Sequence, residues 1–311
     1  MTLKLGVNLP QTQPYDYAHD VITFARCAEE IGYDSLWALE RLLKPMDTSG
    51  VHGLYGVPDL GWPEQYGSVA DPLIVLAMAA AVTERIQIGT GVLVPPLHLP
   101  VRLAKALAAL DAGSGGRLIA GLGVGWSIDE FAATAPRPFA ERGAALEEFL
   151  DVASAVWGPD PVTIDTDRFS VAPAQINPKP GRRIPVYLGG NSRPALRRVA
   201  RRADGWLPSA IAPSAVRNGL EQIRQTAAEH GREPESISCV FQIAYGSTAE
   251  VPTLGRQPYT GSVRQLVEDI AALAEAGVHH VYVSLPYATT DLKSLIGAAE
   301  ELHEAVRGAG L

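Results

Sequence analysis

The chain has 311 residues, a formal net charge of −8 and two cysteines. The negative net charge argues against a nucleic-acid-binding protein. Two cysteines are too few for a disulfide framework, and a chain of this length buries enough surface to fold without disulfide bonds. No run of 18 uncharged apolar residues occurs, and residues 1–9 lack the basic segment and long apolar core of a secretory signal. We therefore expect a cytoplasmic protein whose partners include neither nucleic acid nor a membrane.

Short apolar runs alternate with amphipathic stretches along the chain. The runs expected to form strands are Leu3–Leu9, Ser35–Glu40, Gln87–Val94, Leu118–Gly125, Pro185–Gly190, Gly205–Pro208, Ser238–Tyr245 and His279–Pro286. Strands that alternate with helices pair in parallel, because each return needs a crossover. Eight such units in about 250–300 residues predict an α/β fold, a (β/α)8 TIM barrel that forms a single domain over residues 1–311. Such barrels carry their active sites where the strands run into the following loops.

Helices are expected between the strands. The first is predicted to begin at Asp16 and to end near Gly32, and the next begins at Asp71-Pro72, where proline suits the first helical turn. Longer helices are expected over Leu99–Ala112, Phe139–Trp157 and Leu292–Val306.

Two segments do not fit this repeat. Residues 41–70 follow the second strand and are rich in Gly, Pro and Tyr. A loop of about 30 residues is usually functional, and this one leaves the reactive end of a strand, so we predict a lid over a pocket. Val162–Ile164 and Arg168–Val171 flank a turn and predict a β-hairpin insertion before the fifth strand, within about residues 158–180.

The end of the fifth strand is a candidate anion site. Gly189 and Gly190 let the backbone approach a ligand closely, and Asn191 or Ser192 can cap the helix that follows. The free N–H groups of that helix suit a phosphate, although the same residues also suit an ordinary junction between a strand and a helix. The helix itself, over residues 193–202, holds five arginines, which we interpret as a solvated face rather than an anion patch.

Other strand ends offer small or polar groups to the same mouth. Asn8 ends the first strand, and Glu40 and Arg41 end the second, either as ligand-binding groups or as a solvated ion pair. Glycines within Gly89–Val92 mark a bulge or a close backbone approach, or simply fit a tight interior. In the fourth predicted strand every second residue from Gly121 to Gly125 is glycine, which leaves space inside the barrel mouth. Either a flat ring system or larger side chains from neighbouring strands can fill that space.

Several kinds of catalytic centre have no signature in the sequence. The seven histidines include no His-x-His and no pair four residues apart, so no catalytic metal is expected. No lysine ends a strand, which disfavours a Schiff base, and no Gly-x-Ser-x-Gly motif occurs. A pocket without an evident nucleophile, metal or general base suggests that a cofactor supplies the chemistry.

The chain resembles the bacterial luciferase-like flavin and deazaflavin oxidoreductases, and most closely the branch that uses coenzyme F420, an 8-hydroxy-5-deazaflavin. The resemblance covers nearly the whole chain and rests on Gly32–Trp37, Arg85–Val94, Ser114–Leu118 with Gly123–Trp126, Phe139–Gly143, and Pro185–Gly190 with Ala203–Trp206. It implies a homodimer, a cis peptide bulge at Gly91–Val92 behind the deazaflavin ring, and a coenzyme phosphate at the turn after strand five. The cofactor-binding residues expected from the resemblance and the strand ends together are Asn8, Glu40, Thr90, Gly91, Val92, Gly125, Gly189, Gly190, Asn191 and Ser192.

The sequence departs from the sugar-phosphate dehydrogenases of this branch. They have Asp-His where this chain has Glu40-Arg41, and a glutamate where it has Trp126. Arginine does not accept a proton at neutral pH, and tryptophan makes the pocket more apolar. We therefore expect hydride transfer between F420 and an apolar or conjugated small molecule, with Glu40, Arg41 and Trp126 as the catalytic residues. Two alternatives stay open: an FMN-dependent monooxygenase that uses molecular oxygen, and a non-catalytic ligand-binding barrel.

Overall fold

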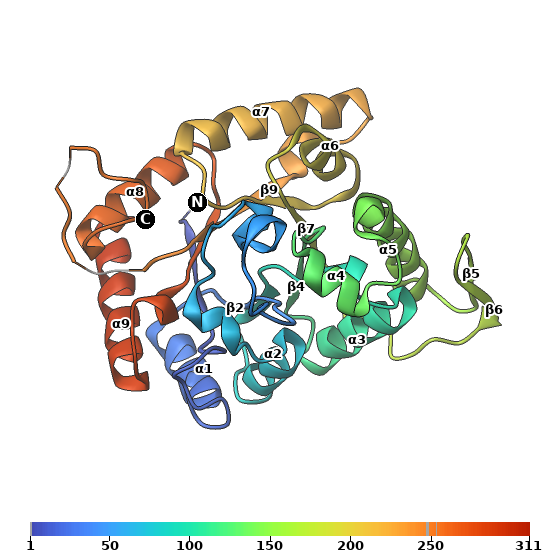
Figure 1. Cartoon of the computed structure of the whole chain (residues 1–311), viewed down its shortest axis with the longest axis horizontal. Coiled ribbons are helices and arrows are strands. Elements are labelled where there is room, and N and C mark those ends of the chain that lie inside the picture. The colour runs from blue at the N-terminus through green and yellow to red at the C-terminus, as the bar shows by residue number, and fades with distance from the viewer. Residues whose placement is uncertain (1, 247–248, 253) are drawn as a thin grey trace.

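The computed structural model describes residues 2–246, 249–252 and 254–311. Parallel strands close into a barrel in the order β1-β10-β9-β8-β7-β4-β3-β2, and helices surround it (Figure 1). The strands are β1 (Lys4–Asn8), β2 (Ser35–Ala38), β3 (Gln87–Thr90), β4 (Leu118–Leu122), β7 (Val186–Gly189), β8 (Gly205–Leu207), β9 (Ser238–Ile243) and β10 (His280–Val283). Each lies within a predicted run, so the (β/α)8 barrel is confirmed. All eight of these strands stop short of the predicted carboxyl end, because the chain there turns into the loops that form the mouth.

The helices predicted by range are present, but two begin several residues later than predicted, and the one expected from Phe139 starts at Arg142 because Phe139–Glu141 forms the separate short helix η5. The helices are α1 (Asp20–Ile31), α2 (Pro72–Ala81), α3 (Pro100–Gly113), α4 (Ile128–Thr134), α5 (Arg142–Trp157), α6 (Arg193–Arg202), α7 (Pro213–Glu229), α8 (Val263–Glu275) and α9 (Leu292–Gly308). The prediction that the first helix begins at Asp16 is wrong, because that carboxylate accepts the N–H of Ala18 at 3.0 Å and closes a turn instead. Within the described ranges, no helix has the length and apolar character needed to cross a membrane.

Aromatic side chains fill the barrel interior beneath the mouth. The rings of Trp37 on β2 and Tyr282 on β10 stack with centroids 4.3 Å apart, and both side chains are fully buried. Trp37 Nε1 donates to Ser35 Oγ at 2.7 Å. Gly89 on β3 has to be glycine here, because a Cβ at this position would lie 2.6 Å from the Trp37 ring. These side chains therefore form a packed floor, and the open space at the carboxyl ends of the strands lies above it.

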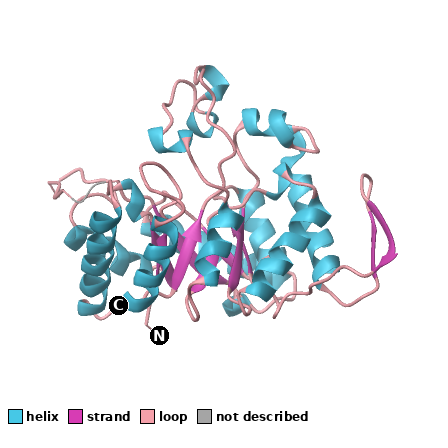
Figure 2. Ribbon diagram, turned by 90° about the horizontal axis from the view of Figure 1, so that it is seen from below, coloured by secondary structure: helices cyan, strands magenta, loops and turns pink. Residues whose placement is uncertain are grey.

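Two insertions interrupt the barrel. Residues 41–70 contain the short helices η1 (Gly50–His52), η2 (Leu54–Gly56) and η3 (Glu64–Gly67), and in Figure 1 this blue segment crosses in front of the strands. Strands β5 (Val162–Asp165) and β6 (Ser170–Ala174) form an antiparallel hairpin that stands away from the barrel (Figure 2).

The two ends of the 41–70 segment are held together by one buried side chain. Gln11 Nε2 donates to the carbonyl oxygens of Leu39 and Ala70 at 2.8 and 2.9 Å, and Gln11 Oε1 accepts the N–H of Leu39 at 2.6 Å. The segment therefore leaves and rejoins the barrel at one point, as a lid closed at its base.

Candidate active site

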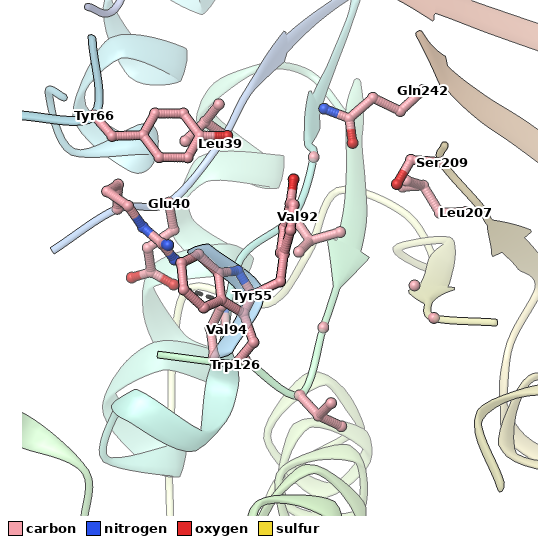
Figure 3. A pocket seen from close by; sticks show the side chains of 17 residues that line it. Leu39, Glu40, Tyr55, Tyr66, Val92, Val94, Trp126, Leu207, Ser209 and Gln242 are labelled. Carbon is pink, nitrogen blue, oxygen red and sulfur yellow. Dashed lines mark hydrogen bonds between the residues drawn. The ribbon is translucent and has the colours of Figure 1, made fainter. Parts of the chain in front are cut away.

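A cavity of about 320 Å³ opens at the carboxyl ends of the strands. Figure 3 shows Tyr55, Tyr66 and Trp126 on one side of it and Leu207, Ser209 and Gln242 on the other. A second cavity of about 390 Å³ continues from it and shares four of these side chains, those of Tyr55, Tyr66, Ser209 and Gln242. The site is therefore a cleft between the barrel mouth and the lid.

Most of the predicted site residues line the first cavity. These are Glu40, Arg41, Gly91, Val92, Gly125, Trp126, Gly189 and Gly190. The peptide between Gly91 and Val92 is cis, as the resemblance implies. Gly190 has φ +107°, a backbone conformation that favours glycine, and this residue turns the chain from β7 toward α6.

The other predicted residues are not brought into this cavity. Thr90 is buried and its Oγ1 donates to the carbonyl of Gly121 at 2.7 Å, while Asn8 Oδ1 accepts from Ser284 Oγ at 3.0 Å. Both side chains instead join neighbouring strand ends. Ser192, exposed at the rim, is the cap of α6: its Oγ accepts the N–H of Ala195 at 3.4 Å.

Exposed Asn191 lies next to this cap and also faces the rim. Its Nδ2 donates to the carbonyl of Ser209 at 3.4 Å. The side chains of residues 191 and 192 therefore lie outside the cavity, next to its glycine-lined edge.

Glu40 is bound to its own side of the mouth. Its Oε2 accepts the N–H of Val94 at 2.6 Å, and its Oε1 lies 2.6 Å from His98 Nε2. Burial lowers the pKa of His98, but the hydrogen bond and charge of Glu40 outweigh it, so the pKa is raised above its ordinary value. The solvated Glu40–Arg41 ion pair, one of the two sequence interpretations, is wrong, because each residue pairs elsewhere.

Arg41 pairs with Glu130, which sequence reasoning missed. Arg41 Nη2 lies 2.8 Å from Glu130 Oε2, and the two side chains are only 5% and 2% exposed. Glu130 Oε1 also accepts the N–H of Leu42 at 2.7 Å. Burial raises the pKa of Glu130 despite the nearby guanidinium. The only local signal was Ser127 three residues earlier, a spacing that indicates a helix cap rather than a partner for Arg41.

Aromatic rings enclose the Arg41 guanidinium. Its central carbon lies 4.6 Å from the ring centroid of Trp126, 5.5 Å from that of Trp62 and 5.7 Å from that of Tyr66. Nε and Nη1 of Arg41 are buried without a hydrogen-bond partner in the described part of the chain. Buried N–H donors are normally satisfied, so these two point to an acceptor that the protein itself does not provide.

Further contacts fasten the lid to α4 and to Trp126, which precedes this helix. His52 Nδ1 lies 3.0 Å from Asp129 Oδ1, and Trp62 Nε1 donates to the carbonyl of His52 at 2.8 Å. The rings of Trp62 and Trp126 lie 4.8 Å apart. The segment that follows β4, from Trp126 into α4, therefore contacts the lid beside the cavity.

Comparison with known proteins agrees with this architecture. Residues 3–251 match the family described as luciferase-like monooxygenase. The chain belongs to this family. An uncharacterized protein of Mycobacterium tuberculosis (strain ATCC 25618 / H37Rv) is 34% identical over 59% of this chain and 65% of its own length. F420-dependent glucose-6-phosphate dehydrogenases of Amycolatopsis mediterranei and Nakamurella multipartita are each 29% identical, over 60% and 72% of this chain.

Those alignments cover 52% and 62% of the two dehydrogenases, so the chain spans little more than half the length of these curated relatives. Two solved structures share the fold over 99% of this chain and 100% of theirs. An F420-dependent secondary alcohol dehydrogenase has a TM-score of 0.78 at 20% identity, and the monooxygenase RslO1 from Streptomyces bottropensis has 0.79 at 18%. At this identity the likeness establishes the (β/α)8 fold and nothing further.

Proposed function

We propose that this member of the luciferase-like family is an F420-dependent oxidoreductase acting on a small apolar or conjugated organic molecule. The observation that carries the proposal is the glycine-lined cavity at the barrel mouth, closed by an aromatic lid. The similarity to enzymes named as F420-dependent dehydrogenases supports the choice of coenzyme.

The cavity fits a flat ring. Its volume falls in the range of small-molecule sites, and Gly91, Gly123 and Gly189 give it walls without side chains. A Cβ on Gly123 would lie 2.8 Å from the side chain of Val92, so a larger residue there would have to displace this part of the cavity wall. The rim at Gly190 and Ser192 leads to the start of α6, where the positive end of the helix dipole suits the coenzyme phosphate, although Pro194 has no N–H and Ser192 already caps Ala195.

When bound, F420 supplies or accepts a hydride at its deazaflavin ring. The protein's own groups bind, orient and shield. The lid excludes water, and the two unpartnered N–H groups of Arg41 can donate to an oxygen atom of a ligand. His98, whose pKa Glu40 raises, can hold a proton at Nε2 against Glu40, which lines the cavity.

Charge pairing in the cavity favours a neutral substrate. The Arg41 guanidinium is neutralised by Glu130, and the Glu40 carboxylate lies against His98. Among the described residues that line the cavity, no cation is left unpaired for a phosphate group of the substrate. The rings of Tyr66 and Trp126 add an apolar wall. We therefore expect an enone or a simple alcohol to be a better substrate than glucose 6-phosphate.

Titration of the purified protein with F420 and with FMN tests the coenzyme. We expect F420 to bind with micromolar or better affinity, and reduced F420 to be oxidised by a conjugated carbonyl compound but not to be formed from glucose 6-phosphate. Submicromolar binding of FMN without F420 binding would instead support the monooxygenase. Binding of neither would support a non-catalytic barrel.

A matched pair of variants locates the site. Gly123→Leu forces a side chain against Val92 in the cavity wall and is expected to weaken F420 binding at least tenfold, about 1.4 kcal/mol. Gly297→Leu adds the same side chain on the exposed surface of α9, where nothing lies within 4 Å, and should leave the affinity unchanged. Equal affinities in both variants would place the coenzyme elsewhere.

The homodimer and the cytoplasmic location stay predictions. Sedimentation of the purified protein tests whether it is a homodimer.

A further inference from the structure

The structure separates the five arginines of α6 into two rows. Arg198 Nε lies 2.7 Å from Glu147 Oε1, and Arg202 Nη1 lies 3.0 Å from Glu147 Oε2 on α5. Asp151, also on α5, forms a further ion pair with Arg202. This row joins two neighbouring helices of the outer wall (Figure 1). Its role is explained by packing.

The second row, Arg193, Arg197 and Arg201, has no such explanation. All three side chains are exposed, and none forms an ion pair or a hydrogen bond with another described residue. Spaced by four, they line up along one side of α6 over about 12 Å. Like charges at this spacing destabilise a helix, and Arg193 in the first turn also opposes the helix dipole. Three unpaired arginines on one helix of a protein with net charge −8 therefore indicate a surface that binds an anion.

The row lies beside a groove that starts near the proposed phosphate position. Pro194, Arg197 and Arg201 line this groove of about 220 Å³ on the outer wall, together with the paired arginines and Glu147. Pro194 lies two residues beyond Ser192, the cap of α6, and Gly190 before it lines the active cavity. A path of one helical turn therefore leads from the cavity over the rim to the arginines.

We propose that the unpaired arginine row binds an anionic chain extending from the coenzyme phosphate, namely an oligocarboxylate. This inference rests on the proposed function and deepens it. F420 carries linked glutamates beyond its phosphate, whereas FMN ends at the phosphate, so the row also distinguishes the two coenzymes. The earlier interpretation of this helix face as merely solvated is then replaced for three of its five arginines.

The test compares F420 without glutamates and F420 with five or more, by fluorescence titration at low salt. Exposed ion pairs each contribute little, so we expect the long tail to improve the Kd of the wild type about tenfold. The preference should vanish in the triple variant R193Q/R197Q/R201Q and at about 1 M salt, where the screening length is about 3 Å. The control triple variant R26Q/R85Q/R102Q removes three exposed arginines elsewhere, with the same change in net charge, and should keep the preference.

The outcomes separate the two proposals. If wild type binds both forms of F420 equally, the arginine row does not hold the tail, while the proposed coenzyme stands. If both triple variants lose the preference, the effect is one of overall charge and the inference is wrong. If neither form of F420 binds to the wild type, the proposed function fails and the inference fails with it.

Discussion

The buried ion pair under the lid gives the sharpest prediction on stability. Glu130→Gln keeps the size of the side chain and its ability to accept the N–H of Leu42, but removes the charge that faces Arg41. Arginine cannot shed its proton to escape, so the variant leaves a buried positive charge without a partner. Breaking a buried pair in this way costs about 3–5 kcal/mol.

The aromatic rings around Arg41 reduce the stability that Glu130→Gln is expected to lose. Trp126, Trp62 and Tyr66 lie within 5.7 Å of the guanidinium and are unaffected by the substitution. A desolvated cation–π contact contributes up to about 2 kcal/mol. We therefore expect a loss near the lower end, about 3 kcal/mol, together with faster hydrogen exchange across residues 41–70.

Urea denaturation of a double-mutant cycle measures this. Arg41→Met, Glu130→Gln and the combined variant are compared with wild type at pH 7.5. Because each partner's charge is costly only when the other is missing, the combined loss should fall short of the sum of the single losses by at least about 1 kcal/mol. A Glu130→Gln loss below about 1 kcal/mol, or strictly additive losses, would refute the reasoning.

Two further predictions concern the barrel floor and its rim. Gly89→Ala forces a methyl group against Trp37 and should lower the free energy of unfolding by about 1–3 kcal/mol. The control Gly297→Ala, on the open surface of α9, should raise it by up to about 1 kcal/mol. Equal shifts of the thermal midpoint in the two variants would contradict this. Burial lowers the pKa of His98, but Glu40 raises it by more, so the folded-state pKa lies above the unfolded-state value of about 6.5. The stabilisation that the His98–Glu40 pair contributes is therefore complete below pH 6.5 and is lost as the pH rises through the folded-state pKa. The stability gap between wild type and His98→Gln should therefore shrink above pH 6.5, and a gap that widens with pH would be inconsistent with this pairing.

Local patterns were enough to predict the barrel. Alternation of apolar runs and amphipathic stretches is a property of neighbouring residues, and it placed all of the barrel strands. Caps are equally local: Asp71 accepts the N–H groups of Leu73 and Ile74 at 2.8 and 3.1 Å, as its position before Pro72 indicates. The glycines of the mouth could also be found in advance, because strand ends in such a barrel converge on one side.

Only the tertiary structure decided which charges meet. Glu40 and Arg41 are adjacent in the chain, yet one lies against His98 and the other against Glu130, which is 89 residues away. The sequence likewise shows five arginines on one helix but not that α5 neutralises only two of them. Strand and helix periods follow from each segment's own side chains, whereas the partner of a charge depends on which distant segments the closed barrel brings within a few ångströms.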